Sequence, residues 1–277
     1  MFSKLPTIAQ TIRQNGLITK KSLGQHFLTD PNLLDKIVAS AGDLSGKTVV
    51  EIGPGPGGLT RSLLQANAAR VIVIEKDSRC IEILNGLQKI VGEKRLIILN
   101  EDALKVKISD IAKDEKIKIV ANLPYNIGTE LLIRWLDELE YIDSMTLMFQ
   151  KEVARRITSE PNSKNYGRLA VLSQWLCETR ILFDISPAAF SPPPKVESSV
   201  ISIWPREKPL YEADREVLEK ITKATFGQRR KMLKVSLKQI TDEPEKILAQ
   251  ARIDPMRRPE NLDISEFCAL AREYGKC

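Results

Sequence analysis

Short apolar runs alternate with segments of helical periodicity between residues 47 and 150. The runs "KTVVEIG", "RVIVIEKD", "KRLIILNED", "KIKIVANLPY" and "SMTLMFQ" predict buried strands, and amphipathic helical stretches separate most of them. This alternation favours an α/β fold with an open, mostly parallel sheet and helices on both faces. A further helix is expected over "TDPNLLDKIVASAG", because Asp30 suits the N-cap, Pro31 the first turn and Gly42 the exit.

The pattern changes after Gln150. Two helical segments precede two further strands, "ETRILFDIS" and "VESSVISIW", which are expected to pair at one edge of the sheet. The proline-containing stretch "WPREKP" marks a boundary, and only helical patterns follow it. One of them, "RRKMLKVSLKQI", predicts a helix that carries Arg230, Lys234 and Lys238 on one face by four-residue spacing. We therefore predict an α/β domain over residues 1–205, with a basic arm at residues 1–20, and a small all-helical domain over residues 206–277.

Basic residues cluster at both ends of the chain. Residues 220–238 hold seven Lys or Arg and no acid, and residues 1–29 also lack acids, within a net charge of +6. Such clusters predict a polyanionic partner, although solubility alone is an open alternative.

Cysteine and histidine usage limits the other site classes. Four scattered cysteines and a single histidine disfavour a zinc site and a disulfide framework and suit a reducing compartment. We expect a cytoplasmic protein. A mitochondrial transit peptide is a disfavoured alternative for the acid-poor start, and no apolar run is long enough to span a membrane.

A glycine-rich loop, "VVEIGPGPGGLT", joins the first predicted strand to the next helix. Gly53, Gly55 and Gly58 let the backbone approach a ligand closely, and the helix start offers free N–H groups. Glu75 ends the second strand, where a carboxylate can accept from ribose hydroxyls. These features predict an adenosine-containing ligand, either a nicotinamide cofactor or a methyl donor, and a purely structural turn is the alternative.

The stretch "VANLPYNIG" ends the fourth predicted strand. The side-chain carbonyl of Asn122, with a backbone carbonyl of Leu123 or Pro124, can accept the two hydrogens of an exocyclic amine and favour the tetrahedral geometry of attack. The ring of Tyr125 can stack on the purine base that carries this amine. Asp102, after the third strand, either accepts from an adenine amine or caps a helix. The loop predicts amine methylation by positioning, without an activated nucleophile.

Several sequence blocks together resemble one family. "EIGPGPGGLT", "IEKD", "NEDAL" and "NLPY", with "KKSLGQHFL", "FSPPPKVESSV", "FGQRRKMLKVSL" and "RPENL", are similar to ribosomal RNA adenine N6,N6-dimethyltransferases. The match runs from about Lys20 to Leu262, and it is closest to the small-subunit (16S, kasugamycin-sensitivity) type. The resemblance implies a Rossmann-like class I methyltransferase sheet, S-adenosylmethionine as donor, no metal, and immature small ribosomal subunits as partner of a monomer.

The resemblance also implies residue roles. Donor binding falls on His26, Leu28, Gly53, Gly55, Glu75, Lys76, Asp102, Ala103 and Asn122. Catalysis falls on Asn122, Pro124, Tyr125 and Phe190, with the two rings sandwiching an extruded adenine. RNA binding falls on Lys20, Lys21, Arg229, Arg230, Lys231 and Lys234. His26 and Val235 stand where many family members have Asn, so their contacts are open.

The implied activity is dimethylation of the N6 of two adjacent adenosines in the 3'-terminal hairpin loop of 16S rRNA, with a role in subunit biogenesis. Three alternatives stay open at this point. They are a large-subunit dimethylase of the antibiotic-resistance type, a nucleic-acid-binding assembly or transcription factor of the same fold, and a nicotinamide dehydrogenase.

Overall fold

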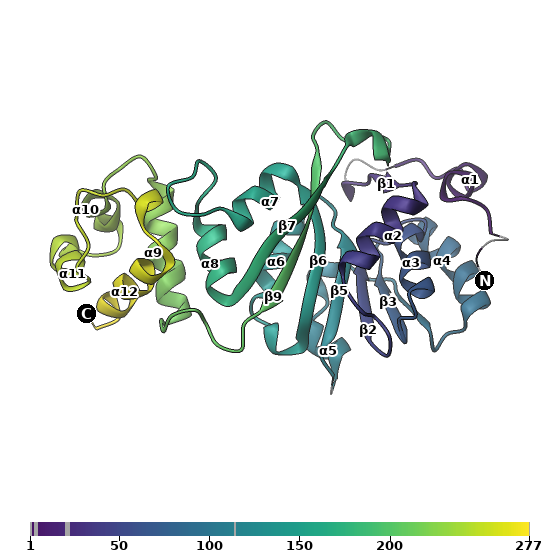
Figure 1. Cartoon of the computed structure of the whole chain (residues 1–277), viewed down its shortest axis with the longest axis horizontal. Helices are drawn as coiled ribbons and strands as arrows, with labels where there is room; N and C mark the ends of the chain where they lie inside the picture. Colours follow the sequence, from purple (N-terminus) through teal and green to yellow (C-terminus); the bar gives the residue numbers. More distant parts are fainter. Residues whose placement is uncertain (1, 3–4, 20–22, 114, 277) are drawn as a thin grey trace. The chain divides into compact units, whose positions relative to one another are not determined.

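The computed structural model describes residues 2, 5–19, 23–113 and 115–276 (Figure 1). The chain divides into two compact units, residues 1–154 with 180–205 and residues 155–179 with 206–277. The domain boundary after residue 205 stays a prediction. Residues 155–179 group with the C-terminal helices and not with the sheet.

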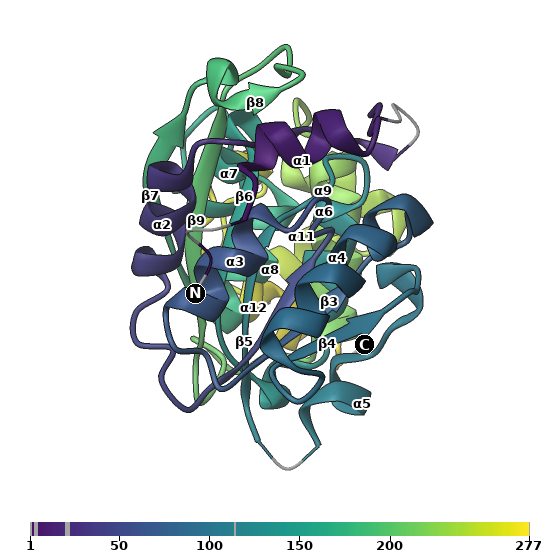
Figure 2. The same ribbon diagram turned by 90° about the vertical axis from the view of Figure 1, so that its right-hand side faces the viewer.

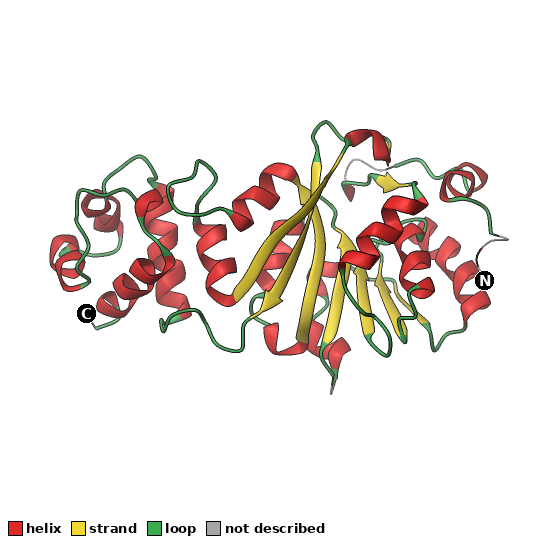
Figure 3. Ribbon diagram, in the orientation of Figure 1, coloured by secondary structure: helices red, strands yellow, loops and turns green. Residues whose placement is uncertain are grey.

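A seven-stranded sheet runs through the described residues in the order β4-β3-β2-β5-β6-β9-β7 (Figure 3). From β4 to β6 the neighbouring strands are parallel, and β9 is antiparallel to β6. This parallel-dominated sheet confirms the predicted fold class, and β7 forms the predicted edge beside β9. The strands are β2 (Thr48–Ile52), β3 (Arg70–Ile74), β4 (Leu96–Leu99), β5 (Ile117–Asn122), β6 (Ile142–Gln150), β7 (Cys177–Ile185) and β9 (Ser198–Pro205).

The strand order reverses between β2 and β5. From β2 the chain builds outward through β3 and β4, and it then returns to the other side of β2 with β5 and β6. Val50 of β2 pairs with Ile72 on one side and Ile119 on the other. In open α/β sheets, ligands bind beyond the carboxyl ends of the strands at such a reversal. The fold therefore puts the loops after β2 and β5 next to each other.

Helices cover both faces of the sheet (Figure 2). On one face, Leu63 and Leu84 pack with Val71 of the sheet in a single buried cluster. Asp30 caps the helix that begins at Pro31, because its carboxylate accepts from the backbone N–H of Asn32 at 2.9 Å. The helices of this unit are α2 (Pro31–Ser40), α3 (Gly58–Gln65), α4 (Ser78–Val91) and α6 (Gly128–Trp135), and α7 (Lys151–Thr158) begins in it.

Four short elements lie outside the sequence predictions. They are α1 (Ile8–Gln14), α5 (Ile108–Ala112), and the two-residue strands β1 (Phe27–Leu28) and β8 (Phe190–Ser191). Elements of this length show too few periods for a pattern to stand out. The first helix has a capping box at its start. The backbone carbonyl of Pro6, just before it, accepts from the Arg61 guanidinium at 2.6 Å, which holds this part of the arm against α3.

The second unit is built from helices around aromatic rings. Phe226 contacts Tyr166 edge-on, with 5.9 Å between ring centroids, and Phe267 at 5.4 Å. The described residues from 206 onward contain only helices and loops beyond the end of β9, as predicted. The helices of this unit are α8 (Arg168–Leu176), α9 (Arg215–Gly227), α10 (Leu233–Ser236), α11 (Pro244–Gln250) and α12 (Ile264–Tyr274).

The prediction of one continuous helix over residues 229–240 is wrong. Only Leu233–Ser236 is α-helical, followed by a short 3-10 turn. The backbone N–H of Leu233 donates to the carbonyl of Arg257 at 2.8 Å, where a longer helix would use the carbonyl of Arg229. A hydrogen bond to a distant segment thus replaces the local one, and the basic residues no longer share one helical face.

Candidate active site

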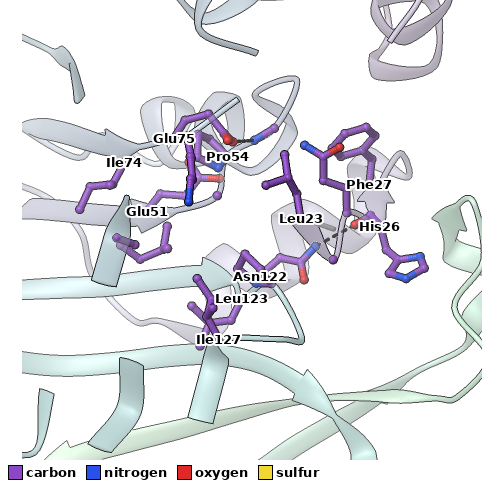
Figure 4. Close-up of a pocket in the computed structure, with 18 of the residues that line it drawn as sticks. Leu23, His26, Phe27, Glu51, Pro54, Ile74, Glu75, Asn122, Leu123 and Ile127 are labelled. Atoms are coloured by element: carbon purple, nitrogen blue, oxygen red, sulfur yellow. Dashed lines mark hydrogen bonds between the residues drawn. The ribbon is translucent and has the colours of Figure 1, made fainter. Parts of the chain in front are cut away.

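A pocket opens at the reversal of strand order, beyond the carboxyl ends of β2 and β5 (Figure 4). Its wall comes from the loop after β2, the end of β3, the segment after β4, the loop after β5 and residues 23–28. All residues predicted to bind the donor line it, namely His26, Leu28, Gly53, Gly55, Glu75, Lys76, Asp102, Ala103 and Asn122. The structure thus brings the whole set together, while their individual roles stay predictions.

The glycine loop forms one side of the pocket, and at Gly53 and Gly55 it does so with backbone alone. Gly55 has φ of +55°, and a Cβ atom built on it would lie 2.7 Å from the ring of Phe27. Both the left-handed backbone and the close ring require glycine at this position. The loop therefore stays in contact with the N-terminal segment and leaves its backbone open to a ligand.

Replacing Gly55 by alanine is expected to weaken donor binding by about fivefold or more. The methyl group would displace Phe27 and strain the backbone, at a cost of roughly 1–3 kcal/mol. Calorimetric titration with S-adenosylmethionine measures this loss. Gly86→Ala is the matched control, because Gly86 lies in α4 with no atom within 4 Å of an added Cβ. The control should bind the donor normally. An unchanged affinity in both variants would contradict a close approach of the donor to the backbone at Gly55.

The Glu75 carboxylate ties the glycine loop to the end of β3. One oxygen accepts from the backbone N–H of Gly55 at 3.1 Å and the other from that of Asp77 at 2.8 Å. Burial raises the pKa of Glu75, and these backbone donors oppose the rise. Each carboxylate oxygen keeps a second lone pair, so the side chain can still accept from a ribose hydroxyl.

Asp102 has one of the two functions that its sequence context left open, that of a cap, and the other stays a prediction. One carboxylate oxygen accepts from the backbone N–H of Leu104 at 3.1 Å and caps a 3-10 turn (Ala103–Lys105). The other forms an ion pair with Lys76 at 2.8 Å, and the bond from Lys76 lowers the pKa of Asp102. The cap fixes the carboxylate at the pocket wall, where it stays ionised and able to accept from a ligand amine.

Asn122 is the last residue of β5 and faces the pocket (Figure 4). Its amide nitrogen donates to the backbone carbonyl of His26 at 3.2 Å. This bond orients the amide, so the side-chain oxygen is the atom left for a ligand. It also joins the loop after β5 to the N-terminal segment.

The structure narrows the choice of the second acceptor. The carbonyl of Pro124 accepts from the backbone N–H groups of Ile127, at 3.2 Å, and Gly128, at 3.0 Å. These two bonds start α6 and use both lone pairs of that oxygen. Of the two carbonyls considered, that of Pro124 is therefore already used.

Tyr125 is held from two sides. Its hydroxyl lies 2.6 Å from the hydroxyl of Ser198, and its ring stacks against His26 with 5.4 Å between centroids. Partial burial raises the pKa of Tyr125, so the phenol is neutral. His26 is fixed in turn, because its Nδ1 lies 2.9 Å from the carbonyl of Pro192.

Phe190 is not among the residues that line the pocket. Only 4% of its surface is exposed, and it belongs to the same buried cluster as Leu28. Its strand β8 pairs with β1, with Phe190 opposite Leu28. The structure brings His26, and not Phe190, against Tyr125. The role of Phe190 as a second wall for the base stays a prediction.

Glu51 is a pocket residue that the sequence reasoning missed. It lines the pocket with 2% of its surface exposed, and its carboxylate accepts from the hydroxyl of Thr60 at 2.7 Å. Burial raises the pKa of Glu51 to about 8. The signal in the sequence was a lone acid inside an otherwise apolar strand, two residues before Gly53.

A buried carboxylate anchors the N-terminal side of the pocket. Asp77 accepts from the side-chain amide of Gln25 at 3.0 Å and pairs with Arg79 at 2.5 Å. Arg79 also donates to the carbonyl of Ile18 at 2.9 Å. These bonds, of which the Arg79 bond is the largest cause, lower the pKa of Asp77. The segment that carries His26 is therefore tied to the start of α4.

A family model described as "Ribosomal RNA adenine dimethylase" matches residues 16–276. The chain belongs to the ribosomal RNA adenine dimethylase family. The predicted family and enzyme class, a methyltransferase, are confirmed.

Relatives of this adenine dimethylase cover nearly its whole length. A protein of Azorhizobium caulinodans named "Ribosomal RNA small subunit methyltransferase A" is 50% identical over 98% of this chain and 94% of its own. One of Rhodospirillum rubrum with the same name is 48% identical over 97% and 92%.

Solved structures resemble the adenine dimethylase in fold. A dimethyladenosine transferase from Plasmodium falciparum is 27% identical, with a TM-score of 0.78 over 91% of this chain and 98% of that one. The 23S rRNA methyltransferase ErmE is 25% identical, with a TM-score of 0.66 over 89% and 98%.

The family implies S-adenosylmethionine as methyl donor, and the pocket fits it. Gly55 leaves a cradle that a Cβ atom would fill, the carboxylates of Glu75 and Asp102 stand at successive strand ends, and Leu28 adds an apolar wall. Such a set suits adenosine with its ribose hydroxyls and amine. When bound, the donor supplies an electrophilic methyl group.

Neither a metal-ligating cluster nor a membrane-spanning helix is found in the described part of the chain. It holds no cluster of three His, Cys, Asp or Glu side chains that could ligate a metal ion. It also holds no helix with the length and hydropathy needed to cross a bilayer.

The predicted RNA-binding residues differ in their surroundings. Arg229 binds the carboxylate of Glu260 at 2.7 Å and the carbonyls of Ser163 and Lys164, so it holds the second unit together. Lys234 lies on α10, 3.6 Å from Glu245. Lys20 and Lys21 lie outside the described residues. The other predicted contacts are Arg230 and Lys231, in the turn before α10.

Proposed function

We propose that this chain dimethylates the N6 of two adjacent adenosines in the 3'-terminal hairpin loop of small-subunit rRNA, with S-adenosylmethionine as donor. The observation that carries the proposal is the placement of the Asn122 amide in one pocket with the glycine loop and Glu75. An amine-positioning loop thus lies next to a donor site. The names of the full-length relatives support the choice of the small subunit.

The methyl transfer needs no strong proton acceptor. The lone pair of an adenine amine is delocalised into the ring, and acceptors aimed at its two hydrogens favour the tetrahedral geometry of attack. The oxygen of Asn122 and the carbonyl of Leu123 serve as these acceptors. Because Pro124 and the start of α6 fix the backbone, the acceptors are in place before the reaction. The proton leaves after the attack, when the amine has become acidic.

The target adenine is placed against the ring of Tyr125. In the described structure, His26 occupies the ring face of Tyr125 that an extruded adenine could use. We infer that the target base either adds to this stack or replaces His26, and that a neutral phenol ring provides the surface.

The RNA contact is assigned to the basic residues. We propose that Arg230, Lys231 and Lys234 contact phosphates together with Lys20 and Lys21, while Arg229 contributes through the integrity of its unit. Recognition is expected to follow RNA shape and a splayed loop. We further place the enzyme in the cytoplasm as a monomer, without a metal and away from membranes.

The function is tested by methyl transfer to isolated subunits. Immature small subunits and, separately, large subunits are incubated with the protein and isotope-labelled S-adenosylmethionine. Label is expected in small-subunit rRNA alone, and primer extension should stop at two adjacent adenosines near its 3' end. Label in the large subunit instead would favour the resistance-type activity, for which the fold of ErmE is the structural precedent. Calorimetric binding of NAD, and not of S-adenosylmethionine, would overturn the methyltransferase site.

A further inference from the structure

The hydroxyl of Tyr125 has a partner that stacking alone does not explain. A ring that only stacks on a base could be phenylalanine, since the hydroxyl adds nothing to the ring face. Yet this hydroxyl lies 2.6 Å from the hydroxyl of Ser198, which is fully buried at the start of β9. The two residues are 73 positions apart in the chain.

Ser198 is fixed by the backbone pairing of its strand. It pairs with Gln150 in the antiparallel ladder of β6 and β9. Next to it, the backbone N–H of Lys151 donates to the carbonyl of Glu197 at 2.9 Å, and the side chains of these two residues form an ion pair at 2.7 Å. Ser198 is therefore held by the end of the β6–β9 ladder and not by a free loop.

We propose that Ser198 is a positioning residue that fixes the orientation of the Tyr125 ring for the target base. The phenol oxygen lies off the Cα–Cβ axis, so tethering it prevents the ring from swinging about that bond. Without the tether, only the stack on His26 orients the ring, and an incoming base competes for that face. The inference rests on the proposed function, because the ring needs a fixed position only if a base stacks on it.

The chain offers a matched control one residue away. Ser199 is as buried as Ser198, lies on the same strand, and donates to the carboxylate of Asp184 at 2.6 Å. Successive side chains of a strand point to opposite faces, so Ser199 points away from Tyr125. Ser198→Ala and Ser199→Ala remove the same atom from the same strand, and thermal unfolding measures whether they cost similar stability.

The test is steady-state kinetics on the small-subunit substrate. Ser198→Ala is expected to lower kcat by roughly tenfold, in line with the sensitivity of catalysis to small misplacements, and to leave the donor Kd unchanged. Ser199→Ala should keep kcat near that of the parent protein. Tyr125→Phe should match Ser198→Ala, and the double variant should lose no more than either single one. Equal turnover in the two serine variants, or losses that multiply in the double variant, would overturn the proposal.

A readout without turnover separates this inference from the proposed function. The protein contains five tyrosines. In a sample labelled with 13C at the tyrosine ring Cζ, the Tyr125 signal is identified by its loss in Tyr125→Phe. Ser198→Ala should shift that signal and Ser199→Ala should not. If the parent protein transfers no methyl group, the proposed function fails, while an unmoved Tyr125 signal in Ser198→Ala refutes the tether by itself.

Discussion

Asn122→Ala is expected to lower the rate of methyl transfer by about 100- to 1,000-fold, the usual cost of removing one preorganised transition-state contact. The variant keeps the backbone carbonyl of Leu123 but loses the side-chain acceptor. The donor Kd should change by less than about tenfold, because Glu75, Asp102 and the glycine loop remain in the pocket wall. Single-turnover methylation and calorimetric donor titration measure the two quantities separately.

Asn126→Ala is the natural comparison, since Asn126 lies in the same loop and lines the same pocket. It should lose far less activity than Asn122→Ala. Unchanged turnover in Asn122→Ala would remove the amine-positioning mechanism. A loss of donor binding in place of turnover would mean that the bond from Asn122 to the carbonyl of His26, at 3.2 Å, is the main contribution of this residue. Normal subunit maturation with the inactive variant would show that binding, and not catalysis, is the dominant role.

Glu51→Gln is expected to stabilise the free protein at alkaline pH. The pKa of Glu51 is raised from 4.5 to about 8 by burial. Folding therefore favours the protonated carboxyl. Its contribution to stability is fully present below about pH 4.5 and is lost as the pH rises through 8. Since a tenfold change in proton affinity corresponds to about 1.4 kcal/mol, the loss between pH 5 and pH 8 is on the order of 4 kcal/mol.

Urea unfolding at a series of pH values tests this effect. The glutamine side chain can still accept from the Thr60 hydroxyl, but it does not titrate. The free energy of unfolding should fall with pH more steeply in the parent protein than in Glu51→Gln, so that the variant is the more stable at pH 8. Glu82→Gln is the control, because Glu82 is exposed on α4. Parallel pH profiles for the parent and Glu51→Gln would show that Glu51 is ionised in the folded chain.

The site shows where sequence reasoning stopped. Motif resemblance brought the donor residues into one set, and the pocket contains all of them. It also joined Phe190 with Tyr125 as two walls of a base site, which stays a prediction; in the structure Phe190 is buried and His26 stacks on Tyr125. A motif records which residue types recur at a position. It does not record which of two rings near one strand pair is buried, because burial depends on packing from distant segments.

The basic tail gives a second example. Four-residue spacing predicted one face of a helix over residues 229–240, but α10 covers only Leu233–Ser236. Arg229 is bound to Glu260, which lies 31 residues further along the chain. Helical spacing describes local periodicity alone, and a salt bridge with a distant carboxylate can override it.

The sequence by itself determined the alternation of the main strands and helices over residues 47–150, the N-cap of α2 at Asp30, the glycine loop and the family. These features depend on neighbours within a few residues, so local patterns in the sequence specify them. Only the tertiary structure decided that Glu51 is buried and that Tyr125 meets Ser198. It also decided that the carbonyl of Pro124 is already used. The first two depend on residues brought together from distant positions, and the third on how the chain turns into α6; no local pattern specifies them.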